Sequence, residues 1–144
     1  MTYADIGQQY VDYMRSHYNS KRYVAFDGYG NGPNIKDHEH VRRAGASAPD
    51  VVFDFSKTIY HDQSSFLANE RNKKKIVAFL MICLQHAGFV VDQAVDDADT
   101  LIVKCALQLA EQNPVIVVSN DTDVFVLLVS IISMLNVTGY VTFT

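Results

Sequence analysis

The sequence predicts an α/β domain in which a mostly parallel central sheet is flanked by helices. Short valine-rich apolar segments alternate along the chain with longer segments whose apolar residues recur every three or four positions. The segment 114–119, PVIVVS, is continuously apolar, which is typical of a strand that is covered on both faces. Strands that alternate with helices in this way favour parallel pairing.

Each predicted element follows from a local pattern. Tyr3, Ile6, Tyr10, Met14 and Tyr18 recur at helical spacing and predict a first helix. The other expected elements are strands at 22–26, 50–55, 89–95, 114–119 and 140–144 and helices at 64–87, 97–112 and 122–135. The loop between the first two strands is rich in glycine and proline, and its segment 35–43 could form a short helix.

Length and composition indicate one globular domain over residues 1–144. Hydrophobic residues make up 49% of the chain and charged residues 19%, so the chain can bury a core. The net charge of −4 argues against a protein that coats nucleic acid over its whole surface, although a local basic patch is compatible with it. Cys83 and Cys105 have no zinc or disulfide spacing, which indicates reduced thiols and an intracellular protein, nuclear or cytoplasmic.

No segment is expected to enter a membrane. The first 18 residues lack the basic head and apolar stretch of a signal peptide. The apolar run 124–137 is interrupted by serines and is shorter than the roughly 20 residues that span a bilayer. We therefore expect it to be a core helix.

Aspartates follow three of the predicted strands. Asp27 ends the strand 22–26, and the other two groups stand where a strand leads into a helix. These groups are Asp96, Asp97 and Asp99 after the strand 89–95, and Asp121 and Asp123 after the strand 114–119. Because ligands of parallel α/β sheets bind beyond the carboxyl ends of the strands, we expect these acids to converge at one edge of the sheet.

Two interpretations of these acids compete. An aspartate at a helix start can cap the helix, which contributes about 1 kcal/mol. Capping requires one acid per helix, however, and each junction offers at least two. Clustered carboxylates repel one another unless protons or cations intervene, and Mg²⁺ or Mn²⁺ prefers such oxygen ligands. Two such ions, about 3.5–4 Å apart, are a known device for phosphodiester hydrolysis.

Three segments resemble the PIN-like, flap-endonuclease-type nuclease superfamily. They are VAFDGYGNGPNIKDHEHVRR at 24–43, DDADTLIVKCA at 96–106 and VIVVSNDTDVFVLL at 115–128, so the resemblance covers most of 23–128. The segment FLANERNKKKIVAFL at 66–80 also looks like members of this superfamily that are encoded in mobile-element-like genes of animals.

The resemblance implies a divalent-metal-dependent nuclease that uses two Mg²⁺ or Mn²⁺ ions on nucleic acid, with DNA favoured over RNA. By this resemblance the metal-site acids would be Asp27, Asp97, Asp99, Asp121 and Asp123. Asp27 would also belong to the catalytic set, together with Lys36 and Arg43, which would contact the scissile phosphate.

The chain departs from the family pattern before Asp27. In the family an earlier strand carries another metal-binding aspartate, whereas Asp5 and Asp12 lie on the predicted first helix. The first core strand is therefore expected to be missing and the domain to be incomplete at both ends. This departure favours the alternative of an inactive PIN-like module that binds nucleic acid or protein.

A second alternative is a phosphatase of the haloacid-dehalogenase type, which uses D-x-D-x-[TV] directly after a strand. The segment 121–125 has Phe125 where threonine or valine belongs, and the segment 54–58 has Ser56 in place of the second aspartate. A separate basic cluster, Arg71 with Lys73, Lys74 and Lys75, is interpreted as a solvated helix face in preference to a nucleic-acid contact.

Overall fold

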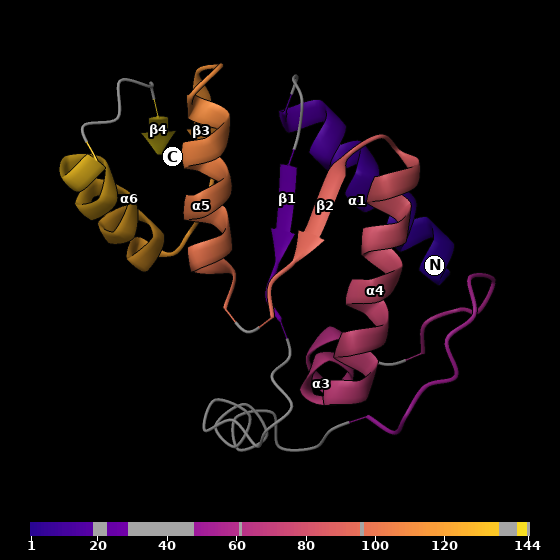
Figure 1. Ribbon diagram of the computed structural model, residues 1–144. Helices are drawn as coiled ribbons and strands as arrows, with labels where there is room; N and C mark the ends of the chain where they lie inside the picture. Colours follow the sequence, from indigo (N-terminus) through magenta and orange to yellow (C-terminus); the bar gives the residue numbers. More distant parts are fainter. Residues whose placement is uncertain (19–22, 29–47, 61, 96, 136–140, 144) are drawn as a thin grey trace.

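The computed structural model describes residues 1–18, 23–28, 48–60, 62–95, 97–135 and 141–143 (Figure 1). Its elements, in chain order, are α1 (Tyr3–His17), β1 (Tyr23–Phe26), α3 (Gln63–Ala68), α4 (Glu70–His86), β2 (Val90–Gln93), α5 (Ala98–Ala110), β3 (Val115–Val117), α6 (Thr122–Leu135) and β4 (Val141–Phe143). The chain is thus a mixed α/β structure. Lys36, Arg43, Asp96 and the segment 35–43 lie outside the described residues.

The strands pair in parallel, but not in one sheet. β1 pairs with β2, with Phe26 opposite Gln93, and β3 pairs with β4, with Val117 opposite Phe143. Among the described residues these are two separate two-stranded sheets. The prediction of parallel strands is confirmed, whereas the prediction of a single central sheet is wrong. Helix α5 contacts both β1 and β3; in Figure 1 it overlaps β3 and stands beside β1.

The predicted strand at 50–55 is also wrong. Val51 and Phe53 do pack against the core, but the backbone of this segment bonds to helices instead of a strand. Ala4 N donates to Phe55 O at 3.0 Å, and Lys75 Nζ donates to Val51 O at 2.6 Å. An alternating apolar pattern therefore marks an extended segment that lies against helices here.

The predicted long helix at 64–87 is divided at Asn69. This residue has an extended backbone (φ −87°, ψ 111°), and its side-chain oxygen accepts from the backbone N–H groups of Arg71 and Asn72. A side chain that satisfies these N–H groups starts a new helix, because the first-turn donors of a helix have no partner within the helix. Helix α3 therefore ends where α4 begins.

The core is divided in the same way as the sheets. Tyr3, Phe66, Ile76 and Phe79 join α1, α3 and α4, while Val11, Leu84, Phe89 and Val91 join α1 and α4 to β2. A further cluster of Val103, Ala106, Val117, Val124 and Leu128 joins α5, α6 and β3. Each half of the chain thus buries its own apolar residues, and α5 connects the halves.

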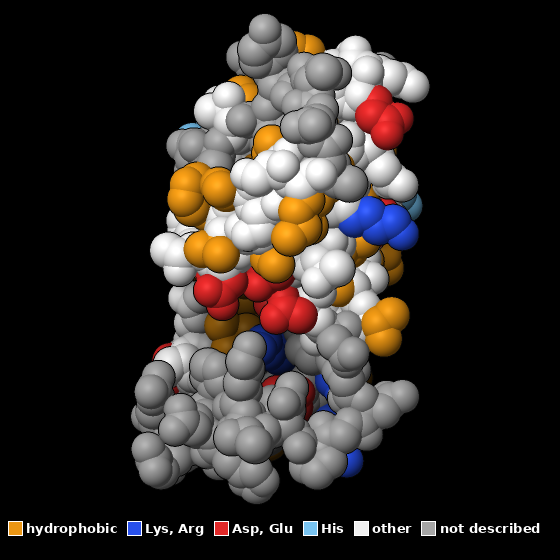
Figure 2. All heavy atoms as spheres, turned by 60° about the vertical axis from the view of Figure 1, so that its left-hand side comes forward, with side chains coloured by type: hydrophobic (Ala, Val, Ile, Leu, Met, Phe, Trp, Pro, Cys, Tyr) orange, Lys and Arg blue, Asp and Glu red, His pale blue; other side chains and the backbone are white. Residues whose placement is uncertain are grey.

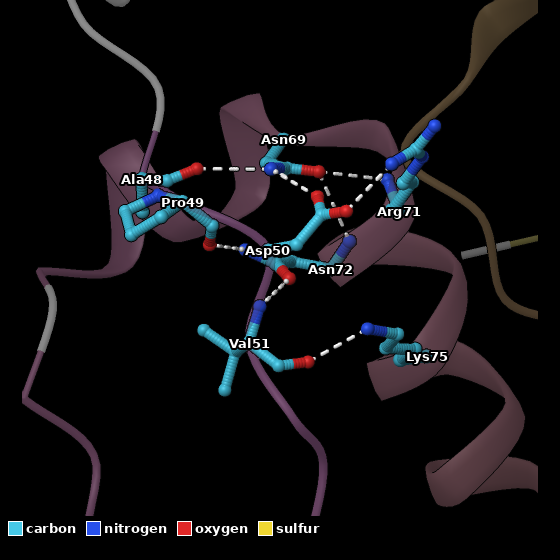
Figure 3. Close-up of polar contacts among 8 residues, drawn as sticks. All are labelled: Ala48, Pro49, Asp50, Val51, Asn69, Arg71, Asn72 and Lys75. Atoms are coloured by element: carbon cyan, nitrogen blue, oxygen red, sulfur yellow. Dashed lines mark hydrogen bonds and ion pairs between the residues drawn. The ribbon is translucent and has the colours of Figure 1, made fainter.

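Polar side chains at the start of α4 hold the segment 48–51 in place (Figure 3). Asn72, which is fully buried, accepts from Val51 N at 2.8 Å and donates to Pro49 O at 2.9 Å. Arg71 pairs with Asp50 at 2.7 Å, and this contact holds the pKa of the Asp50 carboxyl below its usual value. Two members of the basic cluster, Arg71 and Lys75, thus bind the chain's own acceptors.

Two further predictions concern the cysteines and the membrane. Cys83 and Cys105 are both free and partly buried, as expected from their spacing. Among the described residues, no helix combines the length and the apolar character that crossing a membrane requires.

Candidate metal centre

The end of β1 is attached to the start of α5 through Asp27. The Oδ1 atom of Asp27 accepts from Ala98 N at 3.1 Å, and the backbone carbonyl of Asp27 accepts from Gln93 Nε2 at 3.0 Å. Because β1 and β2 run in parallel, Asp27 and the chain that leaves β2 lie at the same end of the strand pair. The first predicted acid is therefore at the carboxyl edge, as its position in the sequence indicates.

The start of α5 carries two of the predicted acids in different roles. Asp97 is the N-cap residue, and its side chain accepts from Asp99 N at 2.9 Å. Asp99 lies in the first turn and is half-buried, whereas Asp97 is exposed. Capping therefore explains Asp97, but it does not explain the second acid.

The start of α6 repeats this arrangement. Asp121 Oδ1 accepts from Asp123 N at 2.9 Å, and Asp121 N donates to Ser119 Oγ at 3.0 Å. Asp123 lies in the first turn of α6, and both aspartates are exposed. Again one acid accepts a first-turn N–H group, and the acid two positions later lies in the first turn, where a negative charge suits the helix dipole.

The acids at the two helix starts meet in space. Asp99, Asp121 and Asp123 each place one carboxylate oxygen within 4.8 Å of the other two. In Figure 2, a group of Asp and Glu side chains lies near the middle of the face that it shows, and a separate acidic patch lies at the upper right. We call these three residues the aspartate cluster. Of the other two predicted metal-site acids, Asp97 is the N-cap of α5, and Asp27, which follows β1, accepts from Ala98 N in the first turn of α5.

The charges of four aspartates act on the carboxyl group of the fifth, Asp99. The pKa of Asp99 is raised, first by partial burial and then by the negative charges of four neighbours. These neighbours are Asp97, Asp121, Asp123 and Asp27, in that order. Such mutual repulsion is relieved by protonation or by a bound cation.

Asp99→Asn is expected to stabilise the metal-free chain slightly. The pKa of Asp99 is higher in the folded chain than in an unfolded chain, so the stability that depends on this group is lost as the pH rises through the folded pKa. Asparagine removes that loss, and the effect is small because solvent screens the cluster. Thermal unfolding at about pH 7 in EDTA should show a higher Tm for the variant, and an unchanged or lower Tm would contradict the repulsion.

A pocket among the described residues lies at the start of β1, at the end opposite to Asp27. It has a volume of about 270 Å³ and is lined by Tyr23, Cys105, Gln108, Leu109, Gln112 and Asn113. Tyr23 is the first residue of β1, whereas Asp27 follows its last residue. The aspartate cluster is not part of this pocket; Asp121 and Asp123 are exposed and Asp99 is half-buried.

The sequence analysis named these aspartates as candidates but did not name the groups that position them. Gln93 and Ala98 hold Asp27, and Ser119 holds the backbone of Asp121. Ser119 could have been found, since a serine two residues before an aspartate often accepts a local backbone bond. Gln93 gives no such signal, because its contact depends on the pairing of β1 with β2.

The segment 54–58, the second of the two segments compared with the phosphatase motif, does not follow a strand in the structure. Asp54 does not follow a strand; it accepts from Ser56 N at 2.9 Å and from Ser56 Oγ at 2.8 Å in a local turn. The segment 54–58 therefore has the geometry of a capped turn and not that of a nucleophile at a strand end.

Comparison with known proteins adds no family assignment. No protein-family model matches this chain, and no curated protein or solved structure was found to match it.

Proposed function

We propose that this chain is a divalent-metal-dependent nuclease domain of the PIN-like, flap-endonuclease type. It would hydrolyse phosphodiester bonds of nucleic acid, DNA in preference to RNA, with Mg²⁺ or Mn²⁺. The observation that carries the proposal is the meeting of Asp99, Asp121 and Asp123, from two different helix starts, within 4.8 Å.

The donor set fits such an ion. All three donors are carboxylate oxygens, the ligand type that Mg²⁺ and Mn²⁺ prefer. Oxygens on opposite sides of a bound Mg²⁺ lie about 4.2 Å apart, and adjacent ones lie about 3 Å apart. The separations of up to 4.8 Å therefore require only small side-chain movements for all three residues to contact one cation. A second ion would draw on Asp97 and Asp27 as well.

The chain's own residues supply rigidity and orientation. Asp27 and Asp97 bond to backbone N–H groups of α5, so they fix the helix that presents Asp99. Bound divalent ions in such sites polarise the phosphate and supply a hydroxide nucleophile. Lys36 and Arg43 would contribute positive charge to the phosphate as the resemblance implies.

Calorimetric titration with Mn²⁺ tests the proposal. The native chain should take up metal saturably, whereas Asp121→Ala combined with Asp123→Ala should bind at least about 100-fold more weakly, because loss of even an outer-sphere partner costs 10–100-fold. The matched control is Asp12→Ala combined with Glu111→Ala, which removes two exposed acids away from the cluster. Equal uptake by both double variants would contradict the assignment.

A cleavage assay then separates the possible activities. Metal-dependent cleavage of a 5′-flap or single-stranded DNA, lost in the Asp121→Ala/Asp123→Ala variant, would support the nuclease. Hydrolysis of a small phosphate ester in its place would favour the phosphatase. Metal uptake with binding of DNA and no cleavage would identify an inactive nucleic-acid-binding module.

A further inference from the structure

The start of α4 binds a carboxylate of the chain's own. Asp50 Oδ2 accepts from Arg71 Nη1 at 2.7 Å, and Asp50 Oδ1 accepts from Asn69 Nδ2 at 3.0 Å (Figure 3). These contacts, with the nearby charges of Arg71 and Lys75, hold the pKa of Asp50 below its usual value. We call Asn69, Arg71 and Lys75 the α4 anion site. Its donors bind a pair of negatively charged oxygens, which a phosphate also offers.

The Asp50 carboxylate can leave this site without a change in the backbone. The side chain of Arg71 is 78% exposed and that of Asp50 is 43% exposed. Exposed ion pairs of this kind contribute little to stability, so another anion can replace one partner. The backbone on both sides of Asp50 is held separately, because Val51 N donates to Asn72 and Pro49 O accepts from it. Rotation of the Asp50 side chain alone would therefore free the site.

The α4 anion site lies at the same end of the fold as the aspartate cluster. Helix α4 and β2 lie side by side and run in opposite directions (Figure 1). The start of α4 is therefore at the end of the strand pair where β2 leads to Asp97 and α5. In Figure 2, Lys or Arg side chains are visible directly below the acidic group near the middle of the view. A polyanion that approaches the aspartate cluster thus meets positive charge next to it.

The local charge suits a phosphate backbone. The segment 69–75, NERNKKK, carries four positive charges and one negative charge. Guanidinium and amide groups are frequent donors to the phosphates of nucleic acids. We propose that the α4 anion site binds a backbone phosphate of the nucleic acid, and that Asp50 occupies the site until the phosphate displaces it. This inference rests on the nucleic-acid substrate proposed above, and it adds a contact that is separate from the metal ligands.

Two substitutions that break the same ion pair should change DNA affinity in opposite directions. Asp50→Asn removes the competing carboxylate and should tighten the binding of a fluorescein-labelled single-stranded DNA about threefold. Arg71→Gln removes the phosphate donor and should weaken this binding about fivefold, as expected for one exposed charge contact. Fluorescence anisotropy in EDTA measures both affinities without metal-dependent cleavage. Loss of the ion pair as a purely structural contact would move both variants in the same direction.

A salt series tests the phosphate contact directly. The slope of log K against log[salt] should become less steep by about 0.7 in Arg71→Gln, the value for one phosphate of a single strand. Arg15→Gln is the matched control and should keep the native slope, because Arg15 donates to Ala87 O beyond the other end of α4. Asp12→Asn, at an exposed acid of α1, is the control for Asp50→Asn and should keep the native affinity.

Weaker DNA binding in both Asp50→Asn and Arg71→Gln, with an equal loss of stability in urea, would overturn the proposal, since the ion pair would then only fix the loop. A native salt slope in Arg71→Gln would also overturn it. Because these measurements use neither Mn²⁺ uptake nor cleavage, both results would leave the metal-centre proposal standing. Conversely, a chain without cleavage whose DNA binding still depends on Arg71 would reject the nuclease and keep the α4 anion site.

Discussion

Gly28→Ala is expected to lower the free energy of unfolding by about 3 kcal/mol or more, at the upper end of what an added methyl group costs. A Cβ at this position would lie 2.2 Å from Ala94 O and 2.3 Å from both the carbonyl carbon and the carbonyl oxygen of Val95. All three atoms belong to the backbone, so no side-chain rotation removes the clash. The chain after β2 must move away from the end of β1.

The same movement should disturb the candidate metal centre. Ala94 N donates to Phe26 O at 2.9 Å, and the chain continues from Val95 to the cap residue Asp97. Separation of these segments would lengthen the contact between Asp27 and Ala98 N. Mn²⁺ affinity should therefore fall in Gly28→Ala even at temperatures where the variant remains folded.

Urea-induced unfolding measures the loss of stability in Gly28→Ala, and Gly88→Ala is the matched control in the same measurement. Gly88 has a φ of +90°, so alanine is strained there, but its Cβ would meet no atom within 4 Å. We expect it to cost about 1–2 kcal/mol, the strain of a left-handed conformation alone. If Gly28→Ala were as stable as Gly88→Ala, the close approach of β1 to the chain after β2 would be wrong.

Asn72→Leu is expected to destabilise the chain by about 2–5 kcal/mol. Asn72 is fully buried, and leucine keeps the number and branching of its side-chain heavy atoms while removing both hydrogen bonds (Figure 3). Val51 N–H and Pro49 C=O then lose their side-chain partner, and an unsatisfied buried polar group costs about 1–3 kcal/mol. Urea-induced unfolding measures the change.

The control for Asn72→Leu is the same substitution at Asn113. That residue is exposed just beyond α5, so its replacement should change stability by less than about 0.5 kcal/mol. A comparable loss at both positions would mean that the buried contacts of Asn72 with the segment 48–51 do not stabilise the fold.

The sequence predicts elements well where the deciding interactions are local. Helix α6 begins at Thr122 and ends at Leu135, the predicted residues, because an acidic start and apolar spacing both lie within the segment. The strand at 50–55 was wrong because its alternating pattern does not reveal what the backbone binds. The division into two strand pairs was also not predictable, since it depends on where α5 packs.

The candidate site likewise has features that local sequence predicts and features that it does not predict. Strand ends and helix starts placed Asp27, Asp97 and Asp121 correctly in the sequence of elements, and all three bond to N–H groups of α5 or α6. Which oxygens meet within 4.8 Å depends on helix orientation and side-chain rotamers, which no local pattern contains. The roles of Lys36 and Arg43 stay predictions.

The bond from Ala98 N to Asp27 joins two parts of the chain that otherwise bury separate cores. Across this joint, Asp27 is the last of the four carboxylates whose negative charges raise the pKa of Asp99, after Asp97, Asp121 and Asp123. A cation held by these carboxylates, as proposed above, would attract the end of β1 and the start of α5 to one point. Divalent ions would then tighten the joint between the two halves in addition to any chemistry they support.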